Sequence, residues 1–183
     1  MRIIAGKHKS RQLQTLDGLD TRPMTDRMKE SVFNTIGPYF DSDIVLDLFG
    51  GSGALSLESL SRGAGFAYCV EKSYQAMKVI RSNVTSLKEN DNVMLLNVDY
   101  KVALNKFKND STTFDLIFLD PPYKLNIMDE LIDFIINNNL LNDKGIIVCQ
   151  YVKDNYHPKD NNYLVIIKNY NYAISEVCIY QKK

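Results

Sequence analysis

The chain has 183 residues, of which 45% are hydrophobic and 24% charged, and its formal net charge at pH 7 is zero. This composition excludes the disordered and fibrous classes, and a chain of this length buries roughly 70% of the surface that its unfolded form exposes, so we expect one core. Net neutrality argues against indiscriminate binding of nucleic acid through charge. Any contact with RNA or DNA should therefore be local and assisted by shape.

The sequence predicts a protein without membrane contact. No apolar stretch approaches the ~20 residues that a spanning helix needs, and residues 1–6 lack the long apolar segment of a signal peptide. We therefore expect a cytoplasmic protein. The cysteines lie far apart in apolar runs, and both histidines stand isolated in polar segments, so we predict buried reduced thiols and no metal site. The cysteines are Cys69, Cys149 and Cys178.

The first 40 residues differ from the rest of the chain, and they predict a small basic hairpin followed by a helix. Lys7, Lys9 and Arg11 concentrate positive charge in the hairpin. The helix should begin near Thr25 or Asp26, either of which can cap it, and end at Gly37 before a proline. We expect residues 1–40 to form an extension close to the functional site, in one compact unit with residues 41–183.

From residue 44 onward, apolar runs alternate with amphipathic helices, which predicts a mostly parallel sheet covered by helices on both faces. We expect strands near residues 44–48, 66–71, 93–97, 114–119 and 146–150. We expect helices near residues 53–62, 74–88, 100–108 and 127–138. Two final apolar runs, 163–167 and 172–180, predict a closing antiparallel hairpin, because their connection is too short for a crossover helix.

A glycine-rich turn follows the first expected strand, which contains Asp47. Glycine lets the backbone approach a ligand closely. Glu71 and Asp99 end the next two strands, where carboxylates can accept the hydroxyls of a ribose and an amino group of the same extended ligand. The cofactor site that we predict consists of Asp47, Phe49, Gly51, Ser52, Gly53, Glu71, Lys72, Asp99 and Asp120.

A nicotinamide dinucleotide is the alternative ligand for this turn. The third glycine of the dinucleotide fingerprint is missing, because position 56 is Ser56. Asp47 would also place negative charge near a pyrophosphate, whereas it favours the ammonium group of a methionine moiety. The residues therefore favour S-adenosyl-L-methionine. A tight strand–helix connection without a ligand is a further alternative, and the carboxylates at the neighbouring strand ends argue against it.

The tetrapeptide Asp120-Pro121-Pro122-Tyr123 follows the apolar run 114–119, so a strand delivers it to the edge of the sheet where open α/β sheets bind ligands. The two prolines remove two backbone donors, which leaves carbonyl oxygens and one carboxylate as acceptors. Such a turn suits a planar ligand with an exocyclic amine, covered by the tyrosine ring. We predict that all four residues are catalytic. A proline-rich loop without a catalytic role is the alternative.

Over nearly its whole length the chain resembles the RsmD-type bacterial 16S rRNA guanine-N2-methyltransferases. The resemblance rests on residues 2–6, 21–34, 46–55, 61–64 and 120–123. It implies a Rossmann-like class I methyltransferase fold, with a mostly parallel seven-stranded sheet and residues 41–183 as the S-adenosylmethionine-dependent domain. The family usually has alanine in place of Gly50, threonine in place of Met24 and an acidic residue in place of Gln150. The exchange at Gly50 looks harmless from the sequence.

The resemblance further implies that the substrate is 16S rRNA, within the small ribosomal subunit or an assembly intermediate, and that the enzyme is a monomer. We expect the RNA contacts at Lys7, Lys9, Arg11, Arg22 and Tyr123. For the basic segment 7–11, a solvated surface hairpin is an equally good interpretation.

Our hypothesis for catalysis is that the Asp120 carboxylate and the Pro121 carbonyl accept the two protons of the guanine N2 amine and direct its lone pair at the cofactor methyl. Tyr123 would stack on the flipped base, worth ~1–3 kcal/mol. One alternative is a DNA adenine-N6 or cytosine-N4 methyltransferase, although the chain has no obvious room for a target-recognition domain. Another is an inactive cofactor-binding partner subunit.

Overall fold

The computed structural model describes residues 1–16, 24–122, 124–153 and 155–183. The predicted site residues Arg22 and Tyr123 lie outside this part of the chain. The strands are β1 (Ile44–Asp47), β2 (Phe66–Val70), β3 (Val93–Leu96), β4 (Phe114–Leu119), β5 (Leu141–Val152), β6 (Leu164–Asn171) and β7 (Ser175–Lys182). The helices are α1 (Asp26–Ile36), α2 (Ala54–Ser61), α3 (Tyr74–Leu87), α4 (Tyr100–Asn109) and α5 (Met128–Asn137), with a 3-10 turn, η1 (Asn90–Asn92).

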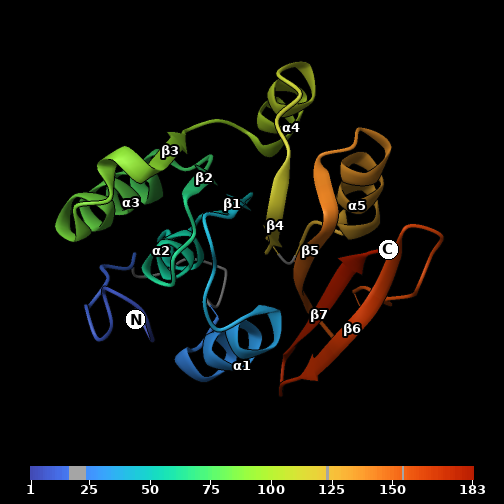
Figure 1. Ribbon diagram of the computed structural model, residues 1–183, viewed down its shortest axis with the longest axis horizontal. Coiled ribbons are helices and arrows are strands. Elements are labelled where there is room, and N and C mark those ends of the chain that lie inside the picture. Colours follow the sequence, from blue (N-terminus) through green and yellow to red (C-terminus); the bar gives the residue numbers. More distant parts are fainter. Residues whose placement is uncertain (17–23, 123, 154) are drawn as a thin grey trace.

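The strands form a seven-stranded sheet in the order β3-β2-β1-β4-β5-β7-β6 (Figure 1). Neighbours from β3 to β5 are parallel, whereas β7 runs antiparallel to both β5 and β6. This is the mostly parallel sheet with a C-terminal antiparallel hairpin that the sequence predicts, so the predicted fold class is confirmed. Along the chain, β2 is next to β1 and β3 is next to β2 on one side of the sheet. The next strand, β4, lies on the other side of β1. The strand order therefore reverses between β1 and β4.

Strand β6 continues through the predicted connection between residues 167 and 172 and ends at Asn171. The other predicted helices and strands agree with the structure within a few residues, except for β5. This strand begins at Leu141 instead of near residue 146. Its pairing with β4 changes register between Phe114 and Leu116, and Lys144 has a φ of +60°. The segment before Gly145 is thus a bulge within the strand. Its residues, Asn142 to Gly145, are also common in turns, so the sequence did not show that the strand begins before them.

Two apolar layers fill the space between the sheet and its helices. Val45 and Phe118 point into the layer under α1, α2 and α3. Their neighbours Leu46 and Ile117 point into the layer under α4 and α5. Successive residues of a strand face opposite sides, so strands buried on both faces need continuous apolar runs. This requirement explains why the strands were recognisable in the sequence.

The N-terminal residues form a hairpin that packs beside α2 (Figure 1). Arg2 pairs with Gln12 in an antiparallel bridge, and the Leu13 amide donates to the Met1 carbonyl at 3.0 Å. The buried carboxylate of Glu58 on α2 accepts hydrogen bonds from the amides of Ile4 and Ala5. The predicted basic hairpin is therefore present, and a buried charge fixes it to the sheet-covering helix.

The helix α1 follows residue 24 and begins where the sequence predicts. The Thr25 hydroxyl caps it by accepting from the Met28 amide at 3.2 Å, and Gly37 ends it with a φ of +122°. Val32 and Phe33 are fully buried against the sheet.

Cysteine thiols lie in both apolar layers. Cys69 on β2 belongs to the layer under α1–α3, whereas Cys149 on β5 and Cys178 on β7 belong to the other layer. All of them are buried and free, as the sequence predicts. Among the described residues, no helix combines the length and apolar character that crossing a membrane requires.

Candidate functional site

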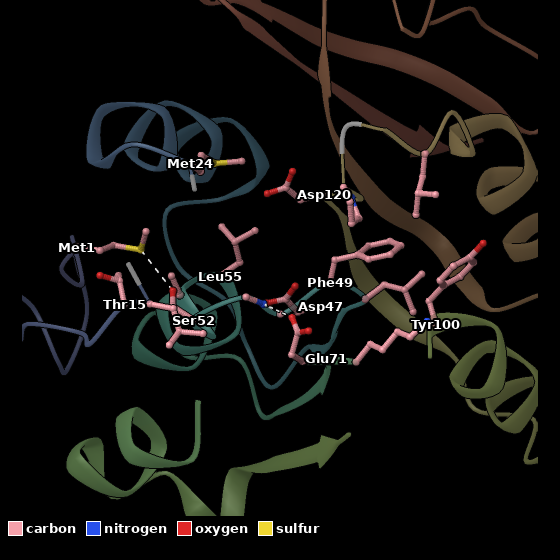
Figure 2. A pocket seen from close by; sticks show the side chains of 18 of the residues that line it. Met1, Thr15, Met24, Asp47, Phe49, Ser52, Leu55, Glu71, Tyr100 and Asp120 are labelled. Atoms are coloured by element: carbon pink, nitrogen blue, oxygen red, sulfur yellow. Dashed lines mark hydrogen bonds between the residues drawn. The ribbon is translucent and has the colours of Figure 1, made fainter. Parts of the chain in front are cut away.

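A cavity of about 740 Å³ opens at the carboxyl ends of the strands, where β1 and β4 lie side by side (Figure 2). A ligand site is expected here, because the strand order of an open α/β sheet leaves a crevice where it reverses. The volume lies within the usual range for small-molecule and cofactor sites. Of the predicted cofactor and catalytic residues, the cavity wall includes Asp47, Phe49, Gly51, Ser52, Glu71, Lys72, Asp99, Asp120 and Pro122.

Among the described residues of the predicted cofactor and catalytic sets, Gly53 and Pro121 do not line this cavity. Gly53 has a φ of +77° and lies at the start of α2, where a Cβ would come 3.2 Å from Ile80. Its role is therefore to allow the tight approach of the turn to α3. The ring of Pro121 is buried on the other side of its turn, beside Tyr151 and Tyr156.

Glu71 fixes the glycine-rich turn to the end of β2. Its Oε2 accepts from the Gly51 amide at 2.9 Å, and its Oε1 accepts from the Ser73 amide at 2.6 Å. A carboxylate oxygen accepts more than one hydrogen bond, so Glu71 keeps capacity for a ligand. The turn is thus held in place by the same side chain that the sequence assigns to ribose binding.

Asp47 is buried at the N-terminal end of α2. Its Oδ2 accepts from the hydroxyl of Ser56 at 3.0 Å and from the Ser56 amide at 3.4 Å. Burial raises the pKa of Asp47 to about 6, although these hydrogen bonds favour the ionised form. A cation in the cavity would therefore stabilise this carboxylate.

Asp120 follows β4, and Figure 2 shows its side chain at the cavity with Met24, Leu55 and Phe49 around it. Its Oδ1 is buried and has no hydrogen-bond partner among the described residues. Burial, and secondly the negative charge of Asp47, raise the pKa of Asp120 to about 8. The carbonyl of Pro122 accepts from the Leu125 amide at 2.8 Å and so closes the turn. An acceptor without a donor is therefore held rigidly at the cavity.

Asp99 and Lys72 lie at the exposed rim of the cavity. The Lys72 ammonium donates to Asp99 Oδ2 at 3.1 Å, and Asp99 Oδ1 caps α4 by accepting from the Lys101 amide at 3.0 Å. The cap, followed by the ion pair, lowers the pKa of Asp99. This carboxylate is therefore an ionised acceptor over a wide pH range.

Several residues of the cavity wall were missed by the sequence interpretation. Tyr100 packs its ring against Phe49, with centroids 5.4 Å apart, and both rings lie at the cavity. Met24, at a position left out of the predicted site, also lines it. The position of Tyr100 directly after Asp99 at a strand end could have identified it. The sequence places residues 1–40 close to the site, but it does not single out Met24 as part of the cavity wall.

The basic hairpin residues lie away from the cavity, and two of them have partners within the protein. The Lys7 ammonium is 2.8 Å from Glu89 Oε1, and the Arg11 guanidinium donates to the carbonyl of Ser86 at 3.0 Å. The Lys9 side chain has no polar partner in the part of the chain that the structure describes. Lys7 and Arg11 therefore help to hold the hairpin on the C-terminal part of α3.

Comparisons with known proteins show relatives that match almost the whole chain. A family model described as conserved hypothetical protein 95 matches residues 1–181. The Bacillus subtilis protein YlbH is 38% identical over 183 residues, which make up 100% of both chains. The ribosomal RNA small subunit methyltransferase D of Escherichia coli K12 is 32% identical over 158 residues, which cover 86% of this chain and 78% of the relative.

Solved structures show the same architecture. The Escherichia coli protein yhhF superposes with a TM-score of 0.88 at 30% identity, over 100% of this chain and 98% of its own. A Streptococcus pyogenes protein superposes with a TM-score of 0.78 at 38% identity, over 85% of this chain and 95% of its own. The family model covers almost the entire chain, and the resemblance seen in the sequence is confirmed. The chain belongs to the RsmD family of ribosomal RNA small subunit methyltransferases.

Proposed function

We propose that the protein transfers the methyl group of S-adenosyl-L-methionine to the exocyclic N2 of a guanine in 16S rRNA. Family membership supports methylation of small-subunit rRNA. The observation that supports the amine target is the Asp120 carboxylate, whose buried Oδ1 has no donor among the described residues. A buried acceptor without a partner costs free energy, and a ligand N–H relieves that cost.

The residues of the cavity fit S-adenosylmethionine as the cofactor. Asp47 and Asp120 supply negative charge for a ligand that carries a sulfonium and an ammonium group. Glu71 and Asp99 supply acceptors for the ribose hydroxyls and the adenine amine, and the rings of Phe49 and Tyr100 supply an apolar wall. When it is bound, the cofactor supplies an electrophilic methyl group.

The turn after β4 orients the guanine amine. Asp120 Oδ1 accepts a hydrogen bond from one N–H of the amine and the Pro121 carbonyl accepts a hydrogen bond from the other, which favours a pyramidal nitrogen with its lone pair free for attack. Holding the reacting atoms in this orientation supplies much of the acceleration. The Pro122 carbonyl is already used by the Leu125 amide, so the turn keeps its shape while it binds the base. In this proposal, the ring of Tyr123 stacks on the target guanine.

The ionised form of Asp120 is the stronger hydrogen-bond acceptor for an amine N–H. Without a ligand, burial keeps the pKa of Asp120 near 8, so the neutral form is well populated at pH 7. Positive charge within a few ångströms favours a carboxylate. Binding of the cationic cofactor therefore prepares Asp120 for the base.

The substrate in this proposal is 16S rRNA within the small ribosomal subunit or an assembly intermediate, methylated by a monomeric enzyme in the cytoplasm. The RNA contacts are Lys7, Lys9, Arg11, Arg22 and Tyr123. Lys7 and Arg11 would then both hold the hairpin on the protein and contact the RNA.

Methyl transfer from labelled S-adenosylmethionine to small subunits that lack base methylation tests the proposal. Nuclease digestion should release the label as N2-methylguanosine. Label that appears as N6-methyladenine or N4-methylcytosine in DNA controls would contradict the guanine assignment. If label enters no nucleic acid, the protein is a cofactor-binding partner subunit.

A further inference from the structure

A second hollow, of about 640 Å³, lies at the far end of α2 from the cavity. We propose that it binds a nucleotide of the rRNA strand that flanks the target guanine, with the base on the Tyr39 ring and the phosphate at Lys9. This inference rests on the proposed function, because it requires an RNA substrate. The walls come from the hairpin, from the connection between α1 and β1, and from the end of α2.

The hollow is preformed, because close backbone contacts fix its walls. Gly6 has a φ of +83°, and a Cβ there would lie 1.8 Å from the carbonyl oxygen of Ser61. Gly63 has a φ of +109°, and its Cβ would lie 2.5 Å from the carbonyl oxygen of Phe40. The Lys7 amide donates to the Ser61 carbonyl at 2.8 Å, which joins the hairpin to α2. A ligand therefore finds the site without an ordering cost for the backbone.

The charge of the hollow suits a phosphate. Its lining includes Lys7, Lys9 and Arg62, and no acidic residue occurs among the described residues that line it. The Arg62 guanidinium is buried and donates to Glu58 at 2.7 Å, and Lys7 pairs with Glu89. Lys9 has no such internal partner, so its ammonium is the cation available to a ligand.

Tyr39 gives the hollow a stacking surface. Its side chain is 67% exposed, and it packs on no other aromatic ring in the described part of the chain. An exposed ring beside cations is the combination with which proteins hold single-stranded nucleic acid. The core of a protein–protein interface is depleted of charged residues, whereas Lys7, Lys9 and Arg62 line this hollow, so its lining favours RNA over a protein partner.

The hairpin connects the two sites. Its first residue lies at the catalytic cavity, where the Ser52 hydroxyl is 3.8 Å from the sulfur of Met1. Its turn, around Gly6 to Lys9, lies at the hollow. The helix α2 separates the two ends by about 12 Å, at 1.5 Å per residue. One RNA strand can therefore reach both sites, with the target base in the cavity and a nearby nucleotide in the hollow.

Substitutions at the two ligand-facing residues test the inference. The probe is unmodified 16S rRNA, transcribed in vitro and assembled with small-subunit proteins. Tyr39→Ala should weaken its binding by about 5- to 100-fold, whereas Tyr39→Phe should bind like the wild type, because stacking needs only the ring. Lys9→Gln should lower the slope of log Kd against log salt concentration by about 0.7, which corresponds to one lost phosphate contact on a single strand. Cofactor affinity should stay unchanged in all three.

Tyr163→Ala is the matched control, because Tyr163 is also largely exposed, at 57%, but precedes β6 at the opposite edge of the sheet. It should bind the probe like the wild type. If Tyr39→Ala and Lys9→Gln bind and methylate like this control while the wild type labels the rRNA, the hollow is not an RNA site and Lys9 is not an RNA contact, but the proposed methyl transfer to rRNA stands. If the wild type itself transfers no methyl group to rRNA, the proposed function falls and the inference falls with it.

Discussion

Asp120 is partly exposed at the cavity, but its Oδ1 is buried and lacks a donor among the described residues, and the role of this oxygen can be tested by removing the charge of the side chain. Asp120→Asn keeps the shape of the side chain but weakens its acceptor capacity. We expect kcat for methyl transfer to fall by about 100-fold or more, as when other preorganised polar contacts to a reacting group are lost. Steady-state kinetics with the small subunit measures this loss.

The cofactor affinity of Asp120→Asn should change much less than kcat, since Glu71, Asp99 and Asp47 remain at the cavity. Calorimetric titration with the cofactor provides that comparison. Asp133→Asn, at an exposed position on α5, is the control for a surface carboxylate. Turnover near the wild-type value in Asp120→Asn would show that the carboxylate does not hold the amine.

The raised pKa values of Asp47 and Asp120 make the stability of the ligand-free protein depend on pH. Between pH 4 and pH 8 the folded state binds more protons than the unfolded state, so stability falls as pH rises through about 6 and about 8. Asp120→Asn cannot ionise at this position. As pH rises from 6 to 8.5, the free energy of unfolding of Asp120→Asn should therefore increase by roughly 2 kcal/mol relative to that of the wild type.

Urea unfolding of both proteins at several pH values without cofactor measures this difference. Saturating cofactor should reduce it, because positive charge stabilises the ionised wild-type carboxylate. A difference between the two proteins that stays constant with pH would mean that Asp120 titrates as an ordinary exposed carboxyl.

At the scale of elements, Glu58 joins the hairpin to α2. Its carboxylate accepts from two hairpin amides and from Arg62, and the buried Lys29 ammonium lies 3.7 Å away. Burial is the largest influence on the pKa of Lys29 and lowers it. The carboxylate therefore offsets the desolvation cost of two buried cations and of two backbone N–H groups.

Glu58→Gln should lower the free energy of unfolding by about 3–5 kcal/mol, because removal of one partner leaves buried charge uncompensated. Glu130→Gln is the matched control: Glu130 also pairs with a lysine, Lys101 at 3.6 Å, but both side chains are largely exposed. That variant should lose at most about 1 kcal/mol. Chemical denaturation of the two variants checks both values, and similar losses would show that the hairpin contributes little to stability.

Sequence was sufficient for elements whose signals are local. Thr25 and Gly37 mark both ends of α1, and the apolar runs of the central strands mark their burial on both faces. It was insufficient where contacts are distant. Gly50 looked exchangeable for alanine, but a Cβ there would lie 2.5 Å from the sulfur of Cys69. The bulge in β5 was hidden for a different reason, since its residues also suit a turn.

The same distinction holds for the site. The carboxylates at strand ends were predictable, because parallel strands bring their carboxyl ends to one edge of the sheet. Met24 was not, since contacts that are distant along the chain bring it to the cavity. The internal partners of Lys7 and Arg11 were also invisible, because Glu89 and Ser86 lie on or beside α3, far along the chain.

At the scale of the whole molecule, net neutrality limits the affinity for bare nucleic acid. The charged residues number 22 basic and 22 acidic. Without a net attraction, binding should depend on shape and on a few local contacts. We expect the assembled small subunit to bind at least about tenfold more tightly than naked 16S rRNA at 150 mM salt, a difference of about 1.4 kcal/mol.

Filter binding of both substrates over a range of salt concentrations measures this preference. The advantage of the assembled subunit should persist at high salt, because contacts with ribosomal proteins release fewer counterions than phosphate contacts. Equal affinities for the two substrates would show that the RNA alone supplies the recognition surface.

The buried thiols make the opening of the molecule observable. Burial raises the pKa of Cys69 and Cys149 well above the ordinary range and that of Cys178 to about 12, so a thiol-specific alkylating reagent has almost no thiolate to attack in the closed protein. Alkylation must then wait for unfolding, local or global. Because Cys69 reports on one apolar layer and the other two on the second, their alkylation rates, followed by mass spectrometry, would reveal whether the two layers open together or in turn.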